Sequence, residues 1–178
     1  VATEGLLMTG VLHQPLSFQP IFLSLSGPPT SERPLPMRRF DPTCRLRGWR
    51  HLAEEVDRVR AQLKDEGANP VLTAERWTQA GELAFYCSGH PTWYYAGLPI
   101  GDRVSQYDLW RPNPVADPEE FKGRTFLLVG QDVKRLLDAF ESHSEVRKIT
   151  YRENDQPVAE CTIVVAHGFR GWDLSHKR

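Results

Sequence analysis

One short segment, QYDLW at residues 106–110, combines two large aromatic side chains with an amide and a carboxylate. It follows the apolar run TWYYAGLPIG, which is typical of a buried strand that has ended. Ligands of open α/β sheets bind beyond the carboxyl ends of strands, so Gln106, Tyr107, Asp108 and Trp110 are candidate binding residues. Asp108 would supply a polar contact, and the two aromatic rings would form a platform for a sugar ring or a partner surface. The alternative is an aromatic plug that closes the core, with Asp108 capping a turn.

A second candidate is the basic segment RRFDPTCRLRGWRH at residues 38–51. Arginine makes bidentate contacts with phosphate and tryptophan favours a membrane interface. Arg45, Arg47 and Trp49 are therefore candidate substrate- or lipid-binding residues. The alternative is a solvated entry to the first helix, with some internal ion pairs. The net charge of −1 gives no general attraction to nucleic acid, so we expect no nucleic-acid partner.

Several common chemistries lack their sequence patterns. The chain has no G-x-G-x-x-G fingerprint, no P-loop and no G-x-S-x-G elbow, which argues against the usual nucleotide-binding and hydrolase sites. The three cysteines are far apart and the six histidines have no metal-ligand spacing, so we expect no metal site and no cofactor. Cys87 and His90 are close in sequence, but CSGHP at the end of a helix favours a turn over a catalytic pair. We expect no catalytic residue in this chain.

The hydrophobic pattern predicts alternating helices and strands. Apolar residues at three-and-four spacing predict a helix that ends near Gly67; they are Trp49, Leu52, Val56, Val59 and Leu63. A second helix is expected over 77–87, and Asp132 is expected to cap a third over 133–140. Strands are expected at 70–75, 92–98 and 123–130, followed by two longer strands about the turn ENDQP.

This order predicts an α/β fold with a three-layer Rossmann-like sheet of about five strands. The sheet is expected to be mainly parallel, with a C-terminal antiparallel hairpin at one edge. Residues 40–178 form the predicted soluble α/β domain, and residues 1–39 form an apolar, proline-rich arm and linker.

The arm has no charged residue from 5 to 31 and is rich in Leu, Phe and Ile. A helix that crosses a membrane needs about 20 mostly apolar residues, whereas His13, Gln14, Pro15 and Pro20 interrupt this run. Two interpretations remain open: an irregular, partly buried arm, or the end of a membrane region or interfacial segment.

Four segments in order resemble one protein family: FDPTCRLRGWRHLAEEV, AERWTQAGELAFYCSGHP, SQYDLW and HGFRGW. From Phe40 to Trp172 the chain is similar to the C-terminal soluble region of bacterial family 39 membrane glycosyltransferases, which are related to dolichyl-phosphate-mannose protein mannosyltransferases. The resemblance implies a GT-C architecture, with many transmembrane helices followed by a domain on the extracytoplasmic (periplasmic) side of the cell membrane.

Enzymes of this family transfer a sugar from a polyprenyl-phosphate carrier to a lipid or protein acceptor. The resemblance therefore implies three partners: the membrane region of the parent chain, the polyprenyl-phosphate sugar and the acceptor. The family's catalytic acidic residue lies in an early extracytoplasmic loop that has no counterpart in this sequence, so this chain is expected to be an accessory domain. The alternative is a stand-alone, non-catalytic α/β binding or interaction module.

Overall fold

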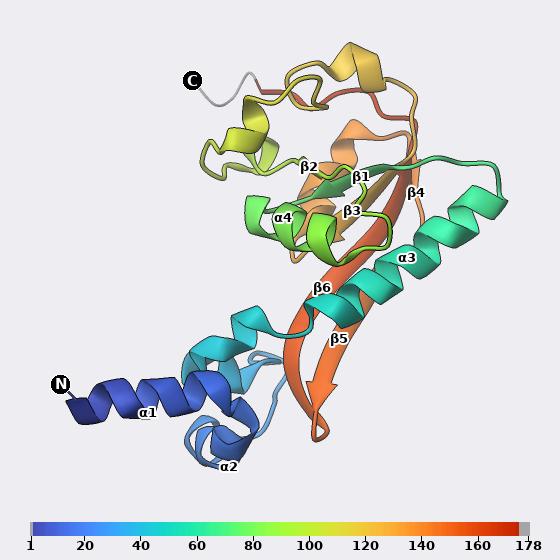
Figure 1. Cartoon of the computed structure of the whole chain (residues 1–178). Helices are drawn as coiled ribbons and strands as arrows, with labels where there is room; N and C mark the ends of the chain where they lie inside the picture. The colour runs from blue at the N-terminus through green and yellow to red at the C-terminus, as the bar shows by residue number, and fades with distance from the viewer. Residues whose placement is uncertain (1, 175–178) are drawn as a thin grey trace. The chain divides into compact units, whose positions relative to one another are not determined.

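The computed structural model describes residues 2–174 as a mixed α/β fold with an open sheet of six strands (Figure 1). The chain divides into two compact units. The first comprises Val1–Gly48 and Thr150–Glu160, and the second comprises Trp49–Ile149 and Cys161–Arg178. The division predicted at residue 40 falls inside the first unit, which also takes residues from the C-terminal hairpin.

The sheet has the strand order β2-β1-β3-β6-β4, and β5 pairs with β6. The strands are β1 (Val71–Ala74), β2 (Tyr94–Tyr95), β3 (Phe126–Gly130), β4 (Ser142–His143), β5 (Arg147–Glu153) and β6 (Gln156–His167). The strand β1 is parallel to both β2 and β3, whereas β6 is antiparallel to β3 and β4. The mixed α/β class is confirmed, but the sheet is not mainly parallel, because β6 pairs with β3 in the sheet interior.

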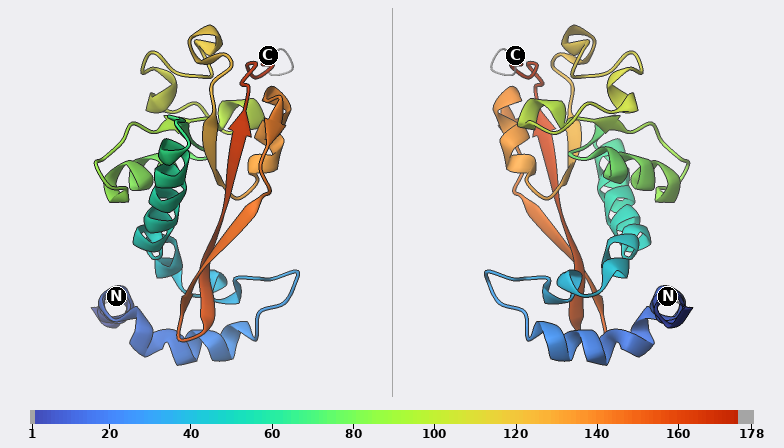
Figure 2. Two further views of the ribbon diagram at one scale, coloured as in Figure 1. Left: turned by 90° about the vertical axis from the view of Figure 1, so that its right-hand side faces the viewer. Right: turned by 90° about the vertical axis from the view of Figure 1, so that its left-hand side faces the viewer.

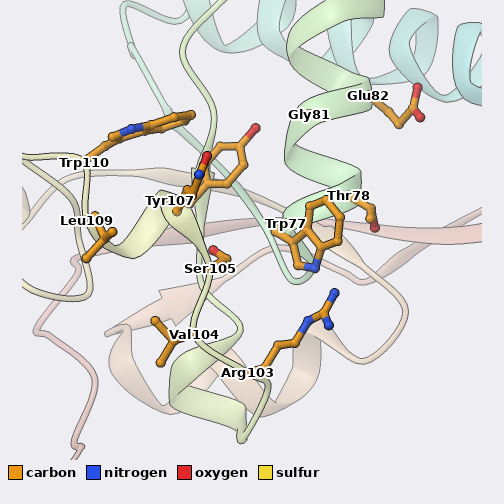
Figure 3. Close-up of a pocket in the computed structure, with 11 residues that line it drawn as sticks. Trp77, Thr78, Gly81, Glu82, Arg103, Val104, Ser105, Tyr107, Leu109 and Trp110 are labelled. Carbon is orange, nitrogen blue, oxygen red and sulfur yellow. The ribbon is translucent and has the colours of Figure 1, made fainter.

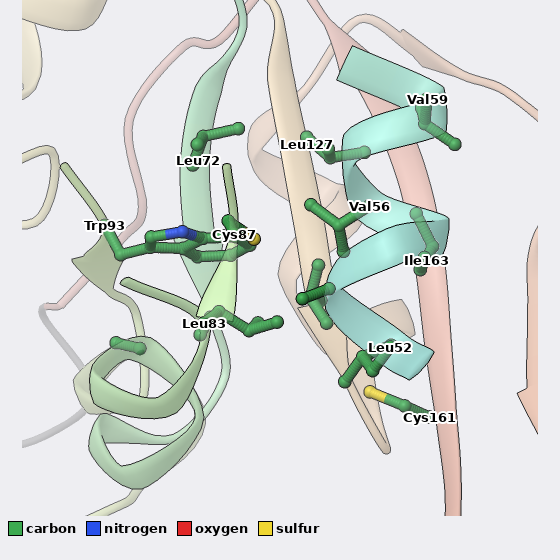
Figure 4. Packing of buried hydrophobic residues seen from close by; sticks show 14 of the residues in the cluster. Leu52, Val56, Val59, Leu72, Leu83, Cys87, Trp93, Leu127, Cys161 and Ile163 are labelled. Carbon is green, nitrogen blue, oxygen red and sulfur yellow. The ribbon is translucent and has the colours of Figure 1, made fainter. Parts of the chain in front are cut away.

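Both faces of this sheet are covered in the second unit. Helices α3 (Trp49–Asp65) and α4 (Trp77–Tyr86) lie on one side of the strands, and the 3₁₀ helix η6 (Val133–Ala139) lies on the other (Figure 2). Along β3, Leu127 and Val129 join the core under α3 and α4 (Figure 4), whereas Phe126 and Leu128 join the core on the other face. A strand buried on both faces must be apolar at successive positions, which explains the continuous run FLLV.

The predicted stripe of α3 is confirmed. Leu52, Val56, Val59 and Leu63 are buried in the core beneath the helix, and Trp49 is partly buried against it. The helix ends in a Schellman motif about Gly67, whose φ of +80° favours glycine. In this motif the N–H groups of Gly67 and Ala68 donate to the carbonyls of Lys64 and Leu63, at 2.9 and 2.8 Å.

The helix predicted over 133–140 is a 3₁₀ helix, and Asp132 does not cap it with its side chain. The buried carboxylate of Glu75, immediately after β1, accepts hydrogen bonds from the N–H groups of Gln131 and Asp132, at 2.5 and 2.7 Å. A carboxylate from a neighbouring strand thus satisfies the backbone donors that a local cap would otherwise bind.

In the first unit the prediction of an irregular N-terminal arm is wrong. Residues Ala2–His13 form α1 and Pro15–Ser26 form α2. Pro15 is tolerated because it opens α2, where a missing N–H costs nothing, and Pro20 removes only one bond inside the helix. Within residues 2–174, no helix is long and apolar enough to cross a membrane.

The first unit has a small core of its own. Met37, Cys44 and Val158 are fully buried there, and Phe22 and Tyr151 pack against them. Besides α1 and α2, the unit contains two 3₁₀ helices, η1 (Pro36–Arg39) and η2 (Pro42–Leu46). Val158 and Tyr151 come from the tip of the hairpin, so distant parts of the sequence build this core.

Candidate functional site

A pocket of about 1020 Å³ lies between the first turns of α4 and residues 103–110 (Figure 3). Helix α4 follows β1, and residues 103–110 follow β2 after the short helix η3 (Leu98–Ile100). Because β1 and β2 are parallel neighbours, both linings come from the carboxyl edge of the sheet. The volume is at the upper end of the usual range for small-molecule sites, about 300–1,000 Å³.

Three aromatic side chains line this cavity, which we term the aromatic pocket: Trp77, Tyr107 and Trp110. The rings of Tyr107 and Trp110 lie 4.9 Å apart between centroids, inclined by 58°. Tyr107 is half-buried against the core under α4, and burial raises the pKa of its hydroxyl. Trp110 is 59% exposed and Leu109 is 73% exposed. A plug would bury all three residues of the Tyr-Leu-Trp stretch, so the plug part of the alternative interpretation is wrong.

Polar side chains stand beside the rings. Gln106, Thr78 and Glu82 line the aromatic pocket, and the guanidinium of Arg103 lies 5.5 Å from the centre of the Trp77 ring (Figure 3). A cation over an indole face is attracted by the ring quadrupole, which holds the arginine at the wall of the pocket. Sequence reasoning missed Trp77 and Arg103, because only the parallel pairing of β1 and β2 brings their segments together.

Asp108 lies outside the lining of the aromatic pocket. One of its carboxylate oxygens, Oδ2, accepts hydrogen bonds from the N–H and the hydroxyl of Ser105, at 2.7 and 3.2 Å. This capping box opens the 3₁₀ helix η4 (Gln106–Asp108). The other oxygen, Oδ1, is buried and has no hydrogen-bond partner among residues 2–174. Asp108 therefore caps a turn, as the alternative interpretation predicted, and the aromatic platform stands on that turn.

Asn113 fixes the far end of the same loop and was not predicted. Its side-chain amide donates to the carbonyls of Trp110 and Asp108, at 2.8 and 3.2 Å. Its carbonyl oxygen accepts from the N–H groups of Val115 and Ala116, at 3.1 and 2.9 Å. An asparagine between two prolines was the available signal, since Asn commonly bonds to nearby backbone in turns.

Tyr95 supports the near end of the loop. Its ring is buried, and its hydroxyl donates to the backbone carbonyl of Arg103 at 2.9 Å. Burial and a nearby aspartate, Asp102, raise the pKa of this hydroxyl, so it stays a donor. A Cβ at Gly97 would collide with the Tyr95 ring, which makes glycine necessary at this close approach. The segment before the aromatic platform is thus held by a buried hydrogen bond.

The other predicted site residues do not line the aromatic pocket. Arg47 is ion-paired with Asp41 and Glu153 inside the first unit, and only 14% of its side chain is exposed. Arg45 is an exposed residue of that unit, and Trp49 packs partly buried against the core of the second. The alternative of internal ion pairs is therefore the correct description of Arg47.

The pair of Cys87 and His90 forms a turn, as predicted. The N–H of His90 donates to the carbonyl of Cys87 at 3.2 Å, and burial raises the pKa of the Cys87 thiol to about 12. A buried thiol that stays protonated at neutral pH is a poor nucleophile. In the part of the chain that the structure describes, no group of three His, Cys, Asp or Glu residues could hold a metal ion.

A comparison of the chain with known protein families, with curated proteins and with solved structures finds no match.

Proposed function

We propose that this chain is the C-terminal extracytoplasmic accessory domain of a membrane glycosyltransferase, and that its aromatic pocket holds a carbohydrate. The observation that carries the proposal is the exposed indole of Trp110, fixed beside Tyr107 and facing a cavity at the carboxyl edge of the sheet. An exposed aromatic face buries the apolar C–H surface of a sugar ring, at about 25 cal/mol per Å². The resemblance of SQYDLW and its neighbouring segments to the family supplies the biological setting.

The polar wall of the pocket supports a carbohydrate over a purely apolar ligand. Sugar hydroxyls both donate and accept hydrogen bonds. Gln106 offers an amide that does both, Arg103 offers donors and Glu82 offers acceptors around the same cavity. In this proposal the parent enzyme presents a polyprenyl-phosphate sugar or its acceptor at the cell membrane, and this domain holds the sugar portion.

The finer fold description belongs to the same proposal. A three-layer Rossmann-like arrangement would place α3 and α4 in one outer layer and the segment around η6 in the other. It is supported by the cores on both faces of the sheet. The binding site of such a fold is expected at the carboxyl ends of its parallel strands.

The test is a titration of the 178-residue chain with a panel of neutral mono- and oligosaccharides. Binding is measured by calorimetry and by tryptophan fluorescence. Binding is expected for at least one sugar, with a change in fluorescence. Trp110→Ala is expected to weaken it about tenfold, which corresponds to about 1.4 kcal/mol of lost stacking. Phe85→Ala is the matched control, because Phe85 is a similarly exposed aromatic on α4 outside the pocket lining.

The proposal fails if no sugar in the panel binds, or if both variants bind as the unchanged chain does. The proposal that the chain belongs to a membrane glycosyltransferase is tested separately, by sequencing the gene upstream of the codon for Val1. About ten apolar spans with an acidic pair in the first loop support the transferase, whereas a start codon next to Val1 favours the stand-alone binding module.

A further inference from the structure

A second cavity, of about 890 Å³, lies at the opposite end of the parallel strands. Val71 and Tyr94, which open β1 and β2, line it, and so does Arg124, which precedes β3. The amino ends of parallel neighbours share one edge of a sheet, so these residues meet although they are far apart in sequence. The last turns of α3 complete the wall with Arg60 and Lys64.

This cavity, which we term the basic groove, has an excess of positive charge. Arg60, Lys64 and Arg124 line it, and the single carboxylate in the lining is that of Asp57. That carboxylate is already engaged, because it accepts from Arg60 at 2.5 Å and from the N–H of Ser88 at 2.7 Å. The groove therefore carries two net positive charges in a chain whose net charge is −1.

The two outer cations have no acidic partner. Within residues 2–174, neither Lys64 nor Arg124 forms an ion pair, and the Arg124 guanidinium lies 5.5 Å from the centre of the Phe121 ring. In the same part of the chain, no hydrogen bond engages the side chains of Asn69, Thr92 or Tyr94. An amide and two hydroxyls thus stand beside two uncompensated cations.

The end of α3 opposes an anion, but weakly. The carboxyl end of a helix carries a partial negative charge that arises from its last unbonded carbonyls. Here the N–H groups of Gly67 and Ala68 satisfy two of these carbonyls in the Schellman motif. The field of the helix end is partial, whereas Lys64 and Arg124 each carry a full charge.

We propose that the basic groove binds the phosphate of a phosphomonoester. A phosphate near pH 7 carries a charge of about −1.5 to −2 and presents three acceptor oxygens. This matches two net positive charges and several separate donors better than a carboxylate, which has one charge and two oxygens. Arginine supplies a planar fork of donors and lysine a compact charge, and both are common phosphate ligands.

Inorganic phosphate is the first probe, titrated into the full chain by calorimetry at low ionic strength. Saturable one-to-one binding is expected, with an affinity that falls as salt is added, because the side chains are exposed. The double variant Lys64→Gln and Arg124→Gln is expected to weaken binding at least thirtyfold. Its matched control is Arg50→Gln with Lys134→Gln, two exposed cations outside the groove lining that should leave affinity within twofold.

Two further probes identify the source of the phosphate. A soluble sugar phosphate that binds at least as tightly as inorganic phosphate supports a phosphomonoester ligand. Tighter binding to phosphatidylglycerol vesicles than to the sugar phosphate, judged against phosphatidylcholine vesicles, overturns it in favour of a lipid phosphodiester. Absence of saturable phosphate binding, or equal weakening in the two double variants, overturns the site itself.

These measurements use no neutral sugar and do not touch the aromatic pocket. Near-UV circular dichroism and urea unfolding test whether each double variant keeps its fold. We expect both to do so, because substitutions at exposed positions usually change stability little. The proposal of phosphate binding at the basic groove can therefore fail or succeed independently of the proposed function.

Discussion

The aromatic pocket and the basic groove lie at opposite ends of the same parallel strands and are built differently. The aromatic pocket depends largely on a loop, whose cavity-facing residues are held in place by buried polar groups, chiefly Tyr95 and Asn113. The basic groove takes its charges from the end of α3 and from Arg124, shortly before β3, without such supports. A site on a loop therefore depends on residues that never touch the ligand, whereas a site on regular elements depends mainly on the residues that do.

The largest expected effect is that of Asn113→Ala. Asn113 is 4% exposed, and its removal leaves four backbone groups without partners. We expect the free energy of unfolding to fall by about 3 kcal/mol, since an unsatisfied buried group costs about 1–3 kcal/mol and part of the loop can rehydrate. Urea denaturation measures this change.

Asn69→Ala is the control, because Asn69 is exposed in the basic groove and makes no hydrogen bond within the described residues. It should change stability by less than about 0.5 kcal/mol. A loss below 1 kcal/mol for Asn113→Ala would show that the loop needs no buried support, and the contrast between the two sites would disappear.

A pair of adjacent tyrosines gives a sharper test of intermediate size. The Tyr95 hydroxyl supports the aromatic pocket, whereas Tyr94 lines the basic groove. Tyr95→Phe is expected to reduce stability by about 1 kcal/mol and to weaken sugar binding while phosphate binding is unchanged. Tyr94→Phe is expected to weaken phosphate binding alone. Calorimetry of both variants with both ligands decides, and a variant that weakens both would refute the independence of the two sites.

The smallest effect concerns pH. Asp117 accepts hydrogen bonds from the Asn113 N–H at 2.9 Å and from Arg111 at 2.8 Å, and these bonds hold the pKa of its carboxyl below the ordinary value of 3.8. Because the pKa is lower in the folded chain, the carboxylate stabilises the loop fully above pH 3.8. This contribution is lost as the pH falls through the folded pKa.

In an NMR titration we expect the Asn113 amide signal to shift at a pH below 3.8, and we expect Asp117→Asn to abolish this shift. The amides of the basic groove, such as that of Asn69, should not follow the same curve. An inflection of the Asn113 signal at or above pH 3.8 would contradict the stabilising contact.

The parts of the fold that the sequence predicted well are those with strong local patterns. The stripe of α3, the apolar run of β3 and the stop at Gly67 each follow from neighbours a few residues apart. The N-terminal helices were missed because prolines and amides broke the apolar run, although Pro15 takes a position that a helix tolerates. The position of β6 inside the sheet was missed because pairing between distant strands leaves no local signal.

The candidate site was predictable only in part, for the same reason. The segment QYDLW was identified by its composition, but which of its residues face the cavity depends on the turn that Asp108 caps. Arg47 looked available for phosphate because one of its two partners, Glu153, lies 106 residues away, although the other, Asp41, lies in the same segment. The basic groove draws its charges from α3 and from Arg124, which the packing of α3 and the parallel pairing of β1 and β3 bring together, so no stretch of the sequence indicates it.

The discontinuity of the first unit has a consequence for the order of folding. Residues 1–48 cannot complete their core until the hairpin tip provides Val158, and Arg47 lacks one of its two carboxylates until Glu153 is present. The second unit, by contrast, takes most of its residues from the stretch in between. During synthesis from the N-terminus, Phe22 of α2 must therefore wait for Val158 before the core against which it packs is complete.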